Sequence, residues 1–106
     1  VEAFLAAELL RRFPDHHLVG EEGGGRGAPA ATAEFHWQVD PLDGTVNFAA
    51  GLPHFCTSIA LTTRDRQPLL GVVYDPVRDE LFAATRGGGA RLDGRPLRVS
   101  ATAELA

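Results

Sequence analysis

The first thirteen positions carry apolar residues at helical spacing. Five large apolar side chains recur near every third or fourth residue: Phe4, Leu5, Leu9, Leu10 and Phe13. Charged side chains take positions between them: Glu2, Glu8, Arg11 and Arg12. This pattern is typical of an amphipathic helix, and Pro14-Asp15 is expected to end it.

Beyond the helix, short apolar runs separated by turn residues predict strands. We expect strands over residues 16–20, 35–39, 55–63, 69–74 and 80–85, and a hairpin of 90–92 and 96–99 around Asp93-Gly94. Residues 23–34 lack large apolar side chains and predict a loop. A helix followed by a mainly antiparallel meander indicates an α+β fold.

Composition narrows the function classes. The 106 residues suffice for one domain or for part of a larger one. A formal net charge of −4 argues against a nucleic-acid surface, and without a run of 18 apolar residues we expect no membrane span. Cys56 is the single cysteine, so no internal disulfide is possible. All ten basic residues are Arg, which excludes a P-loop lysine and a lysine Schiff base.

The two ends of the sequence suggest a piece of a longer protein. There is no Met, and the first residues are already in helical rhythm. Residues 101–106 look like the start of another element. We therefore expect an excerpt cut at both ends, with a complete small domain as the alternative.

Candidate chemistry is concentrated where the strand over 35–39 ends. It runs directly into Asp40-Pro41-Leu42-Asp43-Gly44-Thr45, which holds two carboxylates three residues apart on a turn. Pro41 fixes its own φ, and Gly44 permits a backbone conformation that a side chain would resist. A second acidic pair, Glu21-Glu22, also follows a predicted strand.

Carboxylates held close together either raise a pKa or recruit a cation. Carboxylate oxygens and the Leu42 carbonyl are hard ligands that favour Mg²⁺, Mn²⁺ or Ca²⁺. The N–H groups of Gly44 and Thr45, at the head of a short helical turn, could hold a phosphate. Together these groups suit phosphoryl transfer to water. An ordinary Asp-Gly turn is the alternative, since such turns are common in hairpins.

At these residues the sequence resembles the inositol monophosphatase family of lithium-sensitive, metal-dependent phosphatases. The match is carried by the signature over residues 40–48 (Asp-Pro-Leu-Asp-Gly-Thr-Val-Asn-Phe) and by Gly20-Glu21-Glu22 upstream. Downstream, residues 52–55, 58–60, 71–76, 80–84 and 86–90 follow the family's order. The likeness covers nearly the whole chain and is closest to bacterial inositol-1-monophosphatases.

The resemblance implies a role for each matched residue. Glu21 would ligate the first metal ion and help activate water, Asp40 would bridge the ions, and the Leu42 carbonyl would complete the first site. Asp43 would ligate the second ion near the substrate hydroxyls. Gly44 and Thr45 would bind phosphate through N–H groups, with the Thr45 hydroxyl orienting the attacking water.

The resemblance also implies the wider setting. Residues 1–106 would be a partial N-terminal metal-binding domain of the layered αβαβα sugar-phosphatase fold, inactive by itself. The full-length protein would be a cytoplasmic homodimer that uses two or three Mg²⁺ ions to hydrolyse a small phosphate ester, inositol monophosphate. Histidinol phosphate, fructose-1,6-bisphosphate and 3′-phosphoadenosine nucleotides are alternative substrates. A non-catalytic metal-binding module is the alternative outside catalysis.

Overall fold

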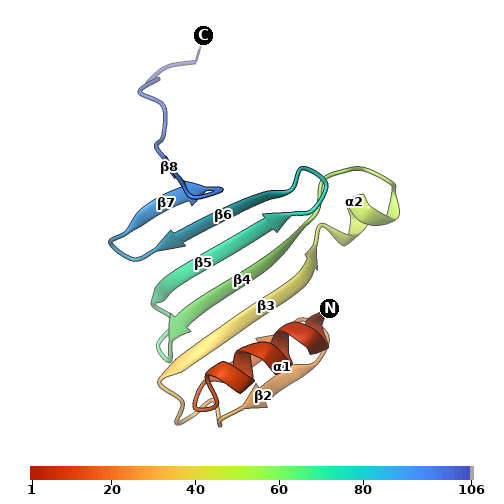
Figure 1. Ribbon diagram of the computed structural model, residues 1–106, viewed down its shortest axis with the longest axis vertical. Helices are drawn as coiled ribbons and strands as arrows, with labels where there is room; N and C mark the ends of the chain where they lie inside the picture. The colour runs from red at the N-terminus through yellow and green to blue at the C-terminus, as the bar shows by residue number, and fades with distance from the viewer. Residues whose placement is uncertain (106) are drawn as a thin grey trace.

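The computed structural model describes residues 1–105, which form two helices and one eight-stranded sheet (Figure 1). The elements follow in this order: α1 (Glu2–Arg12), β1 (His17–Gly20), β2 (Gly24–Gly27), β3 (Phe35–Asp43), α2 (Thr45–Ala49), β4 (Cys56–Thr63), β5 (Pro68–Asp75), β6 (Glu80–Thr85), β7 (Gly89–Leu92) and β8 (Arg95–Leu97). The strand order is β2-β1-β3-β4-β5-β6-β7-β8. All neighbouring pairs are antiparallel except β1 and β3, so the predicted α+β class with a mainly antiparallel sheet is confirmed.

The core lies between α1 and one face of the sheet, where α1 contacts β1 and β3. Four apolar residues form its buried centre: Ala6, Leu18, Trp37 and Val39. Partly buried apolar side chains of α1, β4 and β5 pack around them. In Figure 1, α1 covers only the β1–β3 end of the sheet, while β5–β8 have no helix against them.

The helix is confirmed, but its buried stripe differs from the predicted one. Phe4 is 68% exposed, whereas Ala6 is fully buried and Glu2 is 7% exposed. Glu2 and Ala6 are four residues apart and therefore lie on one side of the helix. Because β1 and β3 approach closely on that side, a small residue fits there better than a phenylalanine.

Two strand predictions needed correction. The segment over 23–34, predicted as a loop, contains β2, which pairs with β1 through backbone groups alone and so needs no large apolar side chains. The strand expected to stop at Val39 continues to Asp43, with an irregularity between Asp40 and Asp43. β-Bulges of this kind tolerate a proline such as Pro41.

The far end of the sheet follows the prediction more closely. Asp93 and Gly94 join β7 and β8 with φ angles of 49° and 82°, as a type I′ turn requires. The chain after β8 leaves the sheet (Figure 1), and residues 101–105 form no regular element, so the start of a new element expected over 101–106 is not found there. Residue 106 lies outside the described residues. No helix within residues 1–105 has the length and apolar character needed to cross a membrane.

Candidate functional site

Parallel pairing of β1 and β3 brings the two acidic segments together. In this register Gly20 lies opposite Val39, so Glu21, the first residue after β1, lies at the level of Asp40 in β3. Both residues line one hollow, and the pKa of Glu21 is raised, first by hydrogen bonding with the Asp40 side chain and then by its negative charge. An antiparallel arrangement would have put the two acids at opposite ends of the strands.

The irregularity in β3 puts Asp40 and Asp43 on the same face of the sheet. Asp40 pairs with Ser58 and Asp43 with Cys56, so three steps along β3 match two steps along β4. Residues three apart in a regular strand point to opposite faces, but one extra residue in a bulge restores the phase. This face is opposite α1, because the neighbouring residues Val39 and Ile59 belong to the α1 core.

The acidic residues line two separate hollows. The first, of about 280 Å³, is lined by Gly20, Glu21, Asp40 and Ser58 among others. The second, of about 400 Å³, has a different rim, which includes Asp43, Gly44, Asn47, His54, Cys56 and Asp75. Thus Glu21 and Asp40 lie together, and Asp43 lies in the second hollow.

Hydrogen bonds and a left-handed glycine hold the end of β3 and its junction with α2. The Asp40 Oδ1 atom accepts a hydrogen bond from the Leu42 N–H group at 3.2 Å, and the Thr57 hydroxyl donates to the Pro41 carbonyl at 2.9 Å. Gly44 has φ 96°, and a Cβ atom at that position would lie 2.7 Å from the His54 carbonyl oxygen. No side chain fits this conformation without displacing the backbone of the following loop.

The exposed residue Thr45 begins α2, as the predicted short helical turn requires. The first bond of this turn runs from the Phe48 N–H group to the Gly44 carbonyl. The N–H groups of residues 45–47 therefore precede the first helical hydrogen bond. They are the groups that an anion could reach.

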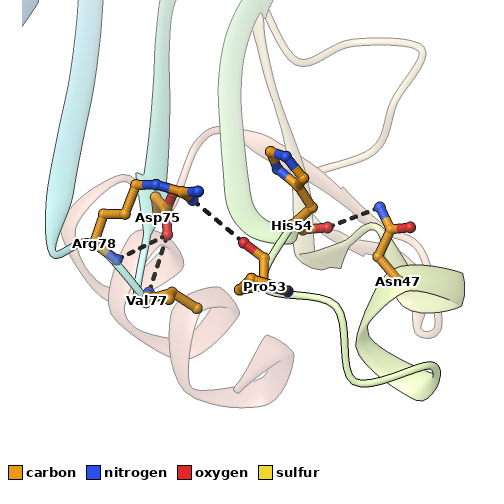
Figure 2. Close-up of polar contacts among 6 residues, drawn as sticks. All are labelled: Asn47, Pro53, His54, Asp75, Val77 and Arg78. Atoms are coloured by element: carbon orange, nitrogen blue, oxygen red, sulfur yellow. Dashed lines mark hydrogen bonds and ion pairs between the residues drawn. The ribbon is translucent and has the colours of Figure 1, made fainter.

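The loop after α2 is tied to the rest of the molecule at two points (Figure 2). The Asn47 side-chain amide donates to the His54 carbonyl at 2.9 Å, and Arg78 donates to the Pro53 carbonyl at 3.3 Å. Arg78 also forms an ion pair with Asp75 at 2.9 Å. Backbone and side-chain hydrogen bonds from Arg78 lower the pKa of Asp75, so this carboxylate remains charged in weak acid.

The described residues do not form a complete metal cage. Among residues 1–105, no three or more His, Cys, Asp or Glu side chains are grouped so as to hold a metal ion. The nearest approach is the pair of Glu21 and Asp40. Glu22 contributes to the raised Glu21 pKa only by its charge, after Asp40 and burial.

Cys56 is the first residue of β4, beside the site, and its thiol is not activated as a nucleophile. The thiol is half-buried, and its pKa is raised, first by burial and then by the charges of Asp43, Asp40 and Asp75. A raised pKa disfavours the thiolate, which is the nucleophilic form. This agrees with a structural role for Cys56.

One residue next to the site was missed by the sequence reasoning. Glu2 was assigned to the polar side of the helix, yet its carboxylate accepts a hydrogen bond from the Glu22 N–H group at 3.0 Å. The available signal was its four-residue spacing from Ala6, combined with the close helix approach that Ala6 permits. Hydrophobicity alone could not reveal it.

With this geometry in view, the comparisons with known proteins identify the family. The inositol monophosphatase family matches residues 1–106, and the chain belongs to that family. Inositol monophosphatase 3 of Solanum lycopersicum is 48% identical over 98% of the chain, and Nus factor SuhB of Pseudomonas aeruginosa is 47% identical over 98%. The solved inositol monophosphatase of Anabaena superposes on 97% of the chain with a TM-score of 0.88 and 44% identity.

The matched region is only part of each relative. The chain spans 39% of the tomato protein, 38% of the Pseudomonas protein and 40% of the Anabaena structure. The fold and the family therefore rest on nearly the whole of this chain.

Proposed function

We propose that the full-length protein containing this chain is a Mg²⁺-dependent phosphomonoesterase that hydrolyses inositol monophosphate. The observation that carries the proposal is the placement of Glu21, which follows β1, beside Asp40 of the parallel strand β3 in one hollow. Membership of the inositol monophosphatase family supports the reaction class. The bulge that turns Asp43 toward the same face supports its inclusion in the site.

The chemistry of the donor set fits a hard divalent cation. Glu21, Asp40, Asp43 and the Leu42 carbonyl offer only oxygen atoms, which Mg²⁺ prefers. The raised pKa of Glu21 marks a carboxyl pair whose mutual repulsion a cation would relieve. Since residues 1–105 group no three such side chains, we infer that further ligands come from the rest of the full-length protein.

In the proposed reaction, this chain positions the phosphate and the attacking water. Bound Mg²⁺ would neutralise phosphate oxygens and lower the pKa of a nearby water molecule. Glu21 accepts the proton of the attacking water, and the Thr45 hydroxyl orients that water. The N–H groups of Gly44 and Thr45 hold the phosphate, while Asp43 lies toward the substrate hydroxyls. Water attacks phosphorus in line while the bond from phosphorus to the inositol oxygen breaks, so no phospho-enzyme forms. The departing inositol oxygen takes up a proton from solvent, and the products are inositol and inorganic phosphate.

The residues of this chain specify the phosphate of the substrate more closely than its alcohol part. Histidinol phosphate, fructose-1,6-bisphosphate and 3′-phosphoadenosine nucleotides present the same phosphate to the same groups. Two solved relatives at 37% identity and 29% identity are described with bound inositol monophosphate and D-inositol-1-phosphate. This favours an inositol phosphate as the first substrate to be tested.

A second candidate comes from the names of other relatives. Proteins called Nus factor SuhB match at 44–47% identity, close to the 48% of the tomato inositol monophosphatase. Sequence identity does not separate the two functions. A role as a Nus factor that needs no hydrolysis would survive the loss of Asp43.

The experiment replaces Asp43 by Asn in the full-length protein and measures phosphate released from inositol-1-phosphate at saturating Mg²⁺. We expect kcat/KM to fall by at least about 100-fold, since the lost group would be a direct metal ligand. Asp15→Asn, a change at an exposed acid beyond α1, is the matched control and should retain activity. Equal hydrolysis by wild type and Asp43→Asn would refute the proposal.

A further inference from the structure

Glu2 is a buried carboxylate with no place in the proposed reaction. It lies in the first turn of α1 and is 7% exposed, on the same side of the helix as the fully buried Ala6. Burying a carboxylate is costly unless its charge and its oxygen atoms find partners. The partners it finds show what it does.

Its main partner belongs to the turn that carries Glu21. The Glu2 Oε1 atom accepts a hydrogen bond from the Glu22 N–H group at 3.0 Å, across twenty positions of sequence. The N-terminus of α1 favours a negative charge at this position. Arg26 of β2 lies at the limit of ion pairing, with 3.9 Å between its Nη2 atom and Glu2 Oε2.

Glycines on both sides of the acidic pair allow this close approach. A Cβ atom built on Gly20 would overlap the Glu2 carboxylate, and one built on Gly23 would lie 2.8 Å from Glu2 Oε2. The carboxylate therefore lies directly against the backbone on both sides of Glu21-Glu22. At Gly20 this explains the absence of a side chain, because the residue continues β1 and has no positive φ.

We propose that Glu2 is a positioning residue for Glu21. By holding the Glu22 N–H group, it fixes the turn after β1 so that the Glu21 carboxylate meets Asp40. The required feature is a hydrogen-bond acceptor at this position, and glutamine provides one as well. The backbone part of this proposal is independent of the proposed function, whereas its effect on Mg²⁺ binding rests on that function.

The first test measures amide hydrogen exchange at Glu22 in full-length wild type, Glu2→Gln and Glu2→Ala. We expect Glu22 exchange to accelerate by about tenfold or more in Glu2→Ala and to stay within about threefold of wild type in Glu2→Gln. Exchange in β3 and β4 should remain unchanged. Glu8→Ala is the control, since Glu8 on the same helix pairs only with nearby arginines.

The second test measures Mg²⁺ binding by calorimetry and the Mg²⁺ dependence of hydrolysis. In Glu2→Ala the Mg²⁺ dissociation constant should rise by about tenfold or more, while kcat at saturating Mg²⁺ changes by less than about threefold. Glu2→Gln should restore most of the affinity. A purely structural defect would lower the fraction of folded, active protein and therefore kcat. It would not raise the Mg²⁺ dissociation constant while leaving kcat at saturating Mg²⁺ nearly unchanged.

Two results would overturn the proposal. Unchanged Glu22 exchange in Glu2→Ala would show that the bond does not hold the turn. Equal loss of Mg²⁺ affinity in Glu2→Gln and Glu2→Ala would show that the charge acts, and not the acceptor. If Asp43→Asn keeps full hydrolysis while Glu22 exchange responds as expected, the proposed function fails and the positioning of the turn stands.

Discussion

The two turns that carry the acidic residues are held in different ways. The turn after β1, with Glu21, is fixed from outside by the Glu2 carboxylate of a helix that begins twenty residues earlier. The end of β3, with Asp43, is held by backbone geometry, through the bulge against β4 and the left-handed Gly44. The first segment therefore depends on the side chain of a distant helix, and the second on backbone conformation and strand pairing.

This difference predicts how each turn responds to substitution. A change in the β3 turn should disturb the backbone directly, with a large cost in stability. A change beside the β1 turn should meet the end of a flexible side chain and cost less.

Gly44→Ala should give the largest loss of stability. Alanine resists φ 96°, and its Cβ atom would crowd the His54 carbonyl, so we expect the free energy of unfolding to fall by about 3 kcal/mol. Gly51→Ala is the control, since Gly51 has φ 76° with open space around it and should cost about 1–2 kcal/mol. Urea denaturation measures both; equal losses would contradict a steric role for the loop carbonyl.

Gly20→Ala should cost about 1–2 kcal/mol, because the new methyl group displaces the Glu2 carboxylate. It should also accelerate amide exchange at Glu22, the effect that we expect of Glu2→Ala. Gly71→Ala, in β5 with nothing near its Cβ position, should be neutral or slightly stabilising. If Glu22 exchange in Gly20→Ala stayed as slow as in wild type, the new methyl group would not be displacing the Glu2 carboxylate from the Glu22 N–H group.

Asp40→Asn should change how stability depends on pH. In the folded protein Asp40 raises the pKa of Glu21, so the proton on Glu21 stabilises the fold at low pH and this stabilisation is lost as pH rises through the folded-state pKa. Without the Asp40 charge this loss should shrink, and Tm in EDTA should exceed that of wild type at neutral pH. Parallel Tm–pH curves for the two proteins would contradict the coupling.

Arg78→Ala should have the smallest effect. Its ion pair with Asp75 and its bond to the Pro53 carbonyl are exposed, so we expect a loss below about 1 kcal/mol. Arg95→Ala, at an exposed position of β8, is the control and should be neutral. A loss above about 2 kcal/mol in urea denaturation would mean that the loop after α2 is held mainly from outside, which would remove the contrast between the two turns.

The sequence predicted best those features that depend on residues close to one another along the chain. The short helical turn that begins at Thr45, the hairpin at Asp93-Gly94 and the first helix depend on residues close in sequence, and all three were found in the structure. Local signals such as Pro, Gly and helical spacing act within a few residues. The roles assigned to the candidate site residues stay a prediction; the structure shows that Glu21 and Asp40 line the same hollow.

What the sequence could not reveal depends on contacts between distant segments. The glycine-rich strand β2 pairs with β1, and its sequence contains no apolar pattern that could predict a strand. Glu2 looked like a surface residue because its partner, the Glu22 N–H group, carries no side-chain signal. The bulge that returns Asp43 to the face of Asp40 appears only when β3 is paired with β4.

The two edge strands of the sheet, β2 and β8, are poorly suited to pairing with a further strand. β2 consists of Gly-Gly-Arg-Gly and β8 of Arg-Pro-Leu, so one border has little side-chain surface and the other contains a proline that cannot donate a hydrogen bond. Short edge strands of this composition are poor templates for pairing with a strand of another chain. Self-association by adding strands at either margin is therefore disfavoured, which protects the chain against sheet-extending aggregation.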